Sequence, residues 1–180
     1  MARIPYPTRE DIPETYRPAF DRMLRERGNP APNVFLALAN LPHALDSLLS
    51  FTRDMRQGAA IAPRYRELAI MMVGHCTNSA YEFDHHWKAA LRAGLQREQL
   101  KNLAEYETSP RFDDRERAIL RYAEEVTATT GARDETWQAL LRHFPENEIM
   151  DLVMAVAWYN AVARILTPLE IELEEWFSRD

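Results

Sequence analysis

Apolar residues recur along this chain at every third or fourth position, which is the spacing of amphipathic α-helices. The strict alternation that marks half-buried strands runs nowhere for long, and only 5 of 180 residues are glycine. Ala, Leu, Glu and Arg dominate the composition, and all four favour helices. The sequence therefore predicts an all-α protein. Breakers and capping residues divide it into eight to ten helices, at about 13–27, 34–39, 43–57, 63–73, 79–93, 96–106, 114–126, 134–143, 146–165 and 168–177.

These helices are expected to form one multi-helix domain over residues 13–180, since no linker, internal repeat or low-complexity tract separates them. A chain of this length can bury a sizeable core. Residues 1–12 are rich in proline and are expected to form an irregular N-terminal arm. The segment 63–73 is nearly all apolar, which predicts a helix buried on most sides.

Composition and charge indicate the cellular location of the protein and exclude some classes of binding partner. The net charge is -6, and the interspersed acids and bases leave no basic stripe for the phosphates of a nucleic acid. The apolar runs are too short to cross a bilayer, and residues 1–5 contain no apolar signal core. The single cysteine, Cys76, can form no disulfide within the chain. We therefore expect a cytoplasmic protein with neither a nucleic acid nor a membrane partner.

The segment 75–87 holds the densest chemistry, combining a thiol, hydroxyl groups, a phenol, two carboxylates and three imidazoles. Ser79, Glu82 and His86 follow the spacing i, i+3, i+7, so a helix would place them along one face. Glu82 stands four residues before His86, where its carboxylate can orient the imidazole. Glu67, inside the preceding apolar segment, needs a polar partner if it is buried, and His86 is the natural candidate. This pattern favours proton transfer.

A structural interpretation of the same residues stays open. The segment 79–82 has the pattern of a capping box, in which a serine and a glutamate bond the backbone at the start of a helix. Ser79 would then be mainly a cap, and Glu82 would be structural as well. In that interpretation His86 is a hydrogen-bonded core histidine, His85 is a solvated neighbour and Tyr81 is a core residue.

Other kinds of chemistry find little support in the sequence. The metalloprotease order HExxH is absent, and the Glu-x-x-His pattern of four-helix metal sites occurs once, at 82–85, without the second copy that such sites use. The nucleophile elbow, the P-loop and the dinucleotide fingerprint are all missing. We therefore expect neither a metal nor a cofactor.

Several motifs, taken in order, resemble the carboxymuconolactone decarboxylase and alkylhydroperoxidase D-like superfamily. The resemblance covers about residues 33–175 and implies an all-α fold, ring-like homo-oligomers (dimer, trimer or hexamer) and a site near subunit contacts. The motifs that carry it are Arg66-Glu67, a gap of eleven residues, Ser79-x-x-Glu82-x-x-x-His86, the helical segment 115–125 and the closing Tyr159-Asn160-x-x-x-Arg164.

The peroxidase branch of that superfamily carries Cys-x-x-Cys-x-x-x-His, and its two thiols relay thiol–disulfide chemistry. Here Ser79 and Glu82 occupy the two cysteine positions, and neither can perform that cycle. Cys76 lies three residues too early, and aligning it with the first cysteine places Phe83 where the histidine should be. Cys76 is thus better interpreted as a small buried hydrophobe. The resemblance implies the fold, whereas the residues argue against peroxidase activity.

The decarboxylase branch offers the closer likeness, and it implies removal of carbon dioxide from a small lactone carboxylate without a cofactor. In that resemblance Glu67 and His86 form an acid–base pair, and Glu82 orients His86. We therefore expect a cofactor-free lyase or isomerase acting on a small anionic metabolite of aromatic breakdown. Two alternatives are a non-catalytic binding or scaffold protein and, third, a hydroperoxide reductase using Cys76. Residues expected to bind substrate or support the site are Ser79, Tyr81, His85, Arg66, Asn160 and Arg164.

Overall fold

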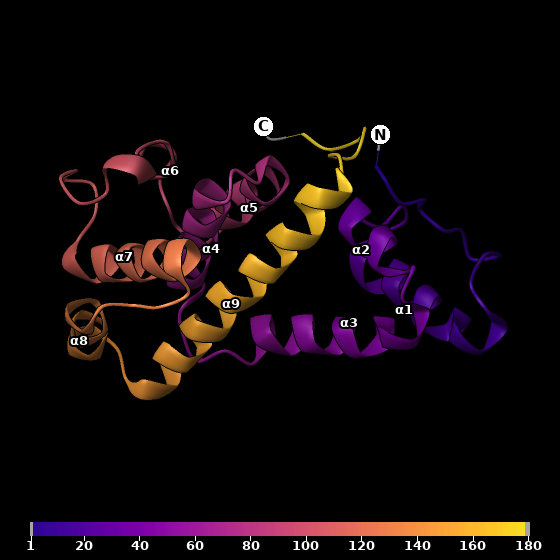
Figure 1. The fold of residues 1–180 in the computed structure, drawn as a ribbon, viewed down its shortest axis with the longest axis horizontal. Helices are drawn as coiled ribbons and strands as arrows, with labels where there is room; N and C mark the ends of the chain where they lie inside the picture. Colours follow the sequence, from indigo (N-terminus) through magenta and orange to yellow (C-terminus); the bar gives the residue numbers. More distant parts are fainter. Residues whose placement is uncertain (1, 179–180) are drawn as a thin grey trace. The chain divides into compact units, whose positions relative to one another are not determined.

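The computed structural model describes residues 2–178, which form nine α-helices, two 3-10 helices and no strand (Figure 1). The prediction of an all-α fold with eight to ten helices is therefore confirmed. In chain order the elements are η1 (Glu14–Tyr16), α1 (Arg17–Arg27), α2 (Asn33–Leu38), α3 (Pro42–Gln57), α4 (Pro63–Cys76), α5 (Ala80–Arg92), α6 (Arg97–Lys101), η2 (Leu103–Glu105), α7 (Asp114–Thr129), α8 (Asp134–His143) and α9 (Glu146–Leu169).

Two expected helix boundaries were wrong. The helix after Pro63 was expected to break at Gly74, but α4 continues through that glycine to Cys76. A separate helix over 168–177 was also expected, yet Pro168 lies in the last turn of α9, which ends at Leu169. Glu170 then adopts a left-handed φ of 53°, and Ile171 bonds back to the carbonyl of Leu166 at 3.1 Å. These turn bonds, typical of helix ends, close α9 where a new helix was expected to begin.

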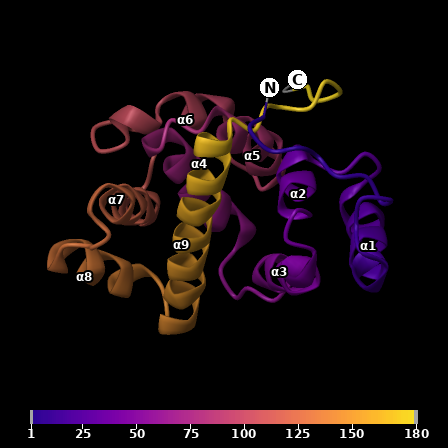
Figure 2. The same cartoon turned by 45° about the vertical axis from the view of Figure 1, so that its right-hand side comes forward.

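The chain divides into two compact units, of which the first comprises residues 2–58 and 166–178. Residues 2–12 form no helix. Helices α1 and α3 pack together (Figure 2), and their apolar faces supply Phe20, Met23, Leu45 and Leu49 to a buried cluster. Regular amphipathic spacing in both helices accounts for this core.

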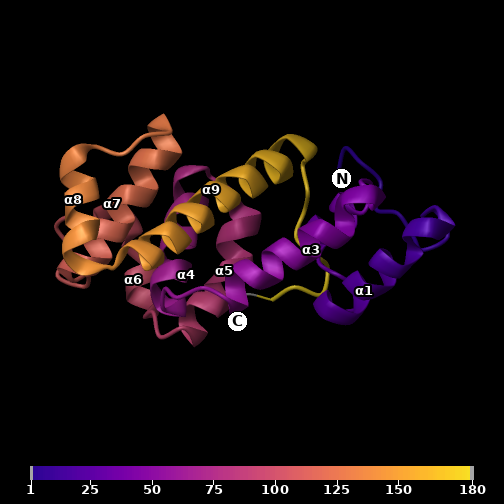
Figure 3. The same cartoon turned by 90° about the horizontal axis from the view of Figure 1, so that it is seen from below.

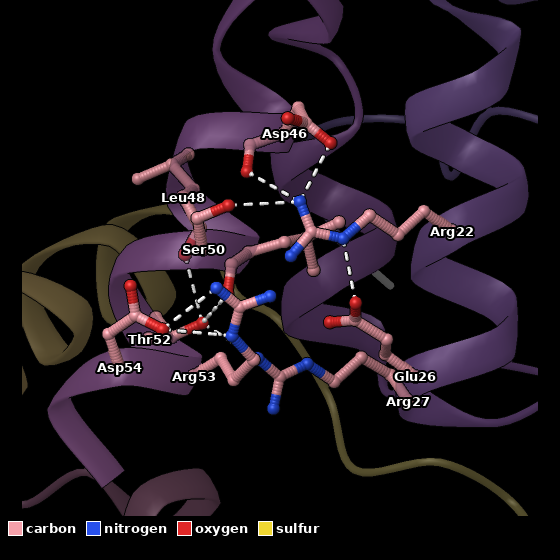
Figure 4. Close-up of polar contacts among 10 residues, drawn as sticks. Arg22, Glu26, Arg27, Asp46, Leu48, Ser50, Thr52, Arg53 and Asp54 are labelled. Carbon is pink, nitrogen blue, oxygen red and sulfur yellow. Dashed lines mark hydrogen bonds and ion pairs between the residues drawn. The ribbon is translucent and has the colours of Figure 1, made fainter. Parts of the chain in front are cut away.

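Arginine side chains connect α1 to α3 beside this core (Figure 4). Arg22 bonds Glu26 Oε1 on its own helix at 2.7 Å, and it reaches Asp46 Oδ1 at 2.8 Å and Ser50 Oγ at 2.9 Å on α3. Arg27 donates to Thr52 Oγ1 at 2.7 Å. These contacts order the polar edge of the first unit.

The second unit comprises residues 59–165 and contains the candidate site. Helix α4 lies against both α5 and α7, while α8 packs on α7 (Figure 3). Every residue of α4 from Arg66 to Gly74 is buried, which agrees with its nearly continuous apolar sequence. A buried carboxylate, Glu116, holds the start of α7 to its neighbours, because it accepts hydrogen bonds from Arg64 Nη2 at 2.5 Å and from Gln99 Nε2 at 3.2 Å.

Helix α9 departs from the expectation that every apolar run is too short to span a bilayer. It has 24 residues and contains an 18-residue window with a mean hydropathy of 1.5, enough by length and composition to cross a membrane. A core helix of a globular protein meets the same criterion. Leu152, Ala155 and Val156 of α9 are fully buried, so core packing accounts for this composition.

Candidate functional site

Two buried side chains from neighbouring helices meet in the second unit. His86 Nδ1 on α5 lies 2.7 Å from Glu67 Oε2 on α4, and the two residues are 8% and 2% exposed. The short distance is that of a strong, charge-assisted hydrogen bond. The partner that the apolar sequence around Glu67 required is therefore His86, as the sequence predicted.

The imidazole of His86 lies between two carboxylates. Its second nitrogen, Nε2, is 3.7 Å from Glu82 Oε2, while Arg66 Nη2 stands 3.7 Å from Glu67 Oε1. These two separations exceed hydrogen-bond length, but they remain strong electrostatic contacts in a buried setting. We call Arg66, Glu67, Glu82 and His86 the buried charge cluster.

The buried charge cluster places acidic and basic groups beside one another on two helices. One carboxyl oxygen lies 2.7 Å from the first imidazole nitrogen of His86, and another lies 3.7 Å from the second. A proton on either ring nitrogen therefore has an acceptor group close by. Such an arrangement can hold and transfer a proton.

Ser79 makes one of the two hydrogen bonds that define a capping box. Ser79 is the N-cap of α5, and its hydroxyl accepts from the backbone N–H of Glu82 at 3.5 Å. The reciprocal bond of a capping box is replaced, because the Ser79 N–H donates to the carbonyl of Gly74 at 3.0 Å. The Glu82 carboxylate approaches His86 instead. Ser79 therefore caps the helix whose first turns carry Glu82 and His86.

A third helix contributes a residue that the sequence analysis did not place in the site. Tyr159 on α9 meets the His86 ring edge to face, with a centroid distance of 4.7 Å and an interplanar angle of 84°. Tyr159 is buried, so its ring closes one side of the imidazole. The closing motif Tyr159-Asn160-x-x-x-Arg164 was the signal that could have identified it.

The other predicted residues lie outside the buried charge cluster. Tyr81 stacks on His85 at a centroid distance of 4.4 Å. Asn160 donates to Thr127 Oγ1 at 2.9 Å and accepts from Arg164 at 2.6 Å. The hydrogen bonds of Asn160 therefore connect α9 to α7, and they do not reach His86.

The segment that carries these residues is similar to a known family. Residues 42–125 match the model of the Carboxymuconolactone decarboxylase family, and they include Glu67, Glu82 and His86. The match covers a little under half of the chain, and it agrees with the resemblance drawn from the sequence motifs. No curated protein matches the sequence significantly.

Solved structures share the fold of this chain. The debrominase Bmp8 is similar over 94% of this chain and 90% of its own, with 19% identity and a TM-score of 0.76. A peroxidase-related protein from Silicibacter sp. TM1040 has 18% identity and a TM-score of 0.79 over 97% and 92% of the two chains. The alkylhydroperoxidase AhpD core protein of Ralstonia eutropha JMP134 has 19% identity and a TM-score of 0.79 over 97% and 93%. At such identities the likeness establishes the fold alone.

The single cysteine of the chain has no activating surroundings. Cys76 is half-buried at the end of α4, and its Sγ lies 3.5 Å from Met72 Sδ. Burial, with a smaller contribution from the Glu124 carboxylate, raises the pKa of the Cys76 thiol to about 11. Because the thiolate is the nucleophile, Cys76 is a poor candidate for peroxide chemistry at neutral pH.

An open depression of about 370 Å³ lies at the start of α5. Ser79 belongs both to its wall and to the cap that precedes Glu82, so the depression reaches the end of the helix that carries the buried charge cluster. Across residues 2–178, no group of three or more His, Cys, Asp or Glu side chains is arranged to hold a metal ion. The residues lining the depression are Gly74, His75, Asn78, Ser79, Ala80, Phe83 and Asp84.

Proposed function

We propose that this protein is a cofactor-free lyase or isomerase in which Glu67 and His86 move a proton to or from a small anionic metabolite. One observation carries the proposal, namely the buried 2.7 Å contact between Glu67 Oε2 and His86 Nδ1. A carboxylate in this position fixes the imidazole tautomer and stabilises the imidazolium that forms when the ring accepts a proton. Glu82, beside Nε2, gives the proton a second position close to the ring.

The chemistry proposed is a decarboxylation that ends in protonation at carbon. The bond between the substrate carboxylate and the adjacent carbon breaks, carbon dioxide leaves, and the electron pair spreads into the unsaturated lactone. The proton held by the cluster then adds to the carbon that lost the carboxylate. A proton from solvent returns the cluster to its starting state. Exclusion of water around Glu67 and His86 favours such dispersal of charge.

The depression at the start of α5 is the proposed approach for the substrate. His75, Asn78 and Ser79 line it with polar groups, and the partial positive charge at the amino end of a 13-residue helix favours an anion. His86 itself is only 8% exposed, so a small local opening between α4 and α5 is part of this proposal.

The experiment is spectroscopic turnover of a carboxymuconolactone-type substrate by the wild type and by Glu67→Gln and His86→Gln. We expect losses of about a hundredfold or more in kcat, which is the usual contribution of a positioned acid–base group. His43→Gln is the matched control, since His43 is exposed on α3 of the first unit. Equal rates in all four proteins would rule out the acid–base pair.

A second candidate is a small-molecule binding or scaffold protein without turnover. It is favoured by the deep burial of the cluster, because a buried carboxylate–imidazole pair can also serve only to join α4 to α5. Saturable calorimetric binding of the lactone carboxylate, with no product detected by mass spectrometry, would favour this candidate over the lyase. Peroxide reduction through Cys76 is a third alternative, and the raised pKa of its thiol opposes it.

We also propose a homo-oligomer, with a small-molecule substrate and no nucleic acid or membrane partner, in the cytoplasm. Leu41, Phe51 and Trp176 of the first unit leave 49%, 36% and 54% of their surface exposed, which suits contact with another copy. Light scattering coupled to size exclusion would distinguish a dimer, trimer or hexamer, and a monomer at all concentrations would contradict the proposal.

A further inference from the structure

Helix α9 has 24 residues (Figure 1), and one of its faces is apolar and exposed. The apolar 18-residue window within this helix is only 44% buried. Met150 and Met154 leave 55% and 37% of their surface exposed, and Ala157 and Ala161 are exposed as well. Their spacing of i, i+4, i+7 and i+11 places these four residues in one line along the helix, which we call the α9 stripe. Contiguous exposed apolar residues are typical of a contact surface.

An acid and a base stand at the two ends of the α9 stripe. Glu146 lies one turn before Met150, and Arg164 lies one turn after Ala161. The two charged residues are 18 positions apart, which is about five turns of 3.6 residues, so both lie on the same edge of the stripe. Both are exposed, and neither forms an ion pair with any residue within 2–178. Each end of the stripe therefore carries a charge for which the described part of the chain supplies no ion-pair partner.

The guanidinium of Arg164 is placed to meet a carboxylate outside its own helix. It donates to the backbone oxygen of Asn160 at 2.9 Å and to the side-chain oxygen of the same residue at 2.6 Å, in both cases through Nη1. Arginine has five N–H donors, so others remain for a carboxylate. The bonds to neutral Asn160 hold the side chain in place without neutralising its charge. The closing sequence motif contains Arg164, and the proposed lyase chemistry does not use it.

The order of the two charges selects the orientation of a second copy of this chain. When two copies pack their α9 stripes antiparallel about a twofold axis, Arg164 of each chain faces Glu146 of the partner subunit. The symmetry forms this ion pair twice, once at each end of the contact. Parallel packing would instead place like charges opposite each other, which costs binding free energy. The charge complementarity therefore favours an antiparallel pair of identical chains.

The same alignment also matches side-chain size across the contact. With the charged ends paired, the centre of the contact falls midway between positions 146 and 164, so Met154 meets Ala157 of the partner subunit. Met150 likewise meets Ala161 of the partner subunit. Each long, adaptable methionine thus packs against a small alanine, which lets the two helices approach closely.

A lipid surface fits the α9 stripe less well than a second copy does. Helices that lie on membranes carry several Lys or Arg residues beside their apolar face. Arg164 is the one basic residue in the α9 sequence, and the whole chain has a net charge of -6, which anionic lipids repel.

We propose that the α9 stripe packs antiparallel against the α9 stripe of a second copy, with two symmetrical ion pairs between Arg164 and Glu146. This interface goes beyond the homo-oligomer proposed above, because it uses a surface other than the exposed residues of the first unit and fixes the relative direction of the two chains. It does not depend on the lyase activity.

The test reverses and exchanges the two charges in the full-length protein. The dimer is measured by analytical ultracentrifugation over about two decades of concentration, since it dissociates on dilution. Arg164→Glu and Glu146→Arg each place like charges opposite each other at both ends of the contact, and each should weaken the dimer about ten- to hundredfold. The double variant Glu146→Arg/Arg164→Glu restores two pairs of opposite charge and should recover the wild-type affinity to within about threefold.

Two single variants serve as a central probe and a matched control. Met154→Glu places two carboxylates at the centre of the contact and should weaken the dimer about a hundredfold or more. Glu148→Arg makes the same charge change as Glu146→Arg two positions later, on another face of α9, and should leave the dimer intact. Circular dichroism checks that each variant keeps its helices.

The outcomes separate this interface from its alternatives. A dimer that neither reversal weakens, or reversals that the double variant does not rescue, would overturn this interface and leave the broader proposal of a homo-oligomer standing. A monomer at every concentration would overturn both. Flotation with vesicles of phosphatidylcholine and phosphatidylglycerol tests the other occupant. If a monomer bound these vesicles and Met154→Glu abolished the binding, the α9 stripe would be assigned to lipid and the proposal would be overturned.

Discussion

Glu67 Oε2 and His86 Nδ1 lie 2.7 Å apart, although 19 positions separate the two residues in the chain. The contact requires α4 and α5 to run side by side at close range. Gly74 permits this approach, because a Cβ at that position would lie 3.3 Å from the backbone nitrogen of Phe83 on α5. A glycine near the end of one helix thus helps to set the distance on which the proposed proton transfer depends.

Replacing this glycine should separate the two helices. In an unconstrained helix Gly→Ala stabilises by up to about 1 kcal/mol, but the new methyl group of Gly74→Ala would press on the backbone of Phe83, which cannot rotate away. We expect a net loss of about 1–2 kcal/mol in the free energy of unfolding, measured by urea denaturation. Gly131→Ala is the control, since nothing lies within 4 Å of its added Cβ. A Gly74→Ala protein as stable as the wild type would contradict the close packing.

Removing the hydroxyl of Ser79 should affect stability through the cap of α5. Ser79→Ala deletes the acceptor for the Glu82 N–H, and the usual cost of losing an N-cap is about 0.5–2 kcal/mol. Ser79→Asn restores an acceptor and should recover most of that loss in thermal or urea unfolding. If Ser79→Ala and Ser79→Asn were equally destabilised, the hydroxyl would have a role other than capping.

The ring of Tyr159 should matter for activity through its contact with His86. Tyr159→Leu removes the edge-to-face contact and leaves the imidazole free to tilt, for which we expect roughly a tenfold fall in kcat at an unchanged KM. Tyr159→Phe keeps the ring and should retain more activity than Tyr159→Leu. Equal activity in the two variants would show that the ring does not position His86.

Acid stability should depend on Glu125 at the end of α7. Burial acts to raise the pKa of its carboxyl, but hydrogen bonds from the Arg133 N–H at 2.9 Å, the Arg133 guanidinium at 2.6 Å and the Thr136 hydroxyl at 2.9 Å lower it overall. Because the folded pKa lies below the unfolded value, this stabilisation is complete above about pH 4.5 and is lost as the pH falls through the folded pKa. Glu125→Gln should flatten the acid limb of a plot of unfolding free energy against pH, and exposed Glu135→Gln should not.

The thiol of Cys76 should react slowly with a disulfide reagent. With a pKa of about 11, only about one thiol in a thousand is ionised at pH 8, so the labelling rate should rise about tenfold per pH unit up to pH 10. Cys76→Ser should abolish labelling and leave any lyase turnover intact. Rapid labelling that is independent of pH would contradict the assignment of Cys76 as an inert, half-buried thiol.

The part of the candidate site that lies on a single helix was predictable from the sequence. Glu82 and His86 are four residues apart on one helix, so periodicity alone places them on the same face. The partner of Glu67 could be predicted as well, because a carboxylate inside an apolar segment requires one. Tyr159 was missed as a site residue, since a helical pattern near the end of the chain does not show which earlier helix it will meet.

The sequence by itself determined the all-α fold, most helix positions and the residue types of the buried charge cluster, because these follow from apolar spacing and local chemistry. Only the tertiary structure decided that Tyr159 closes the cluster, that Asn160 and Arg164 bond elsewhere, and that Ser79 makes one bond of a capping box while Gly74 accepts the other. It also decided where α4 and α9 end. These outcomes depend on which helices pack together and how closely, and that is set by the sum of many contacts between distant segments, which no local pattern contains.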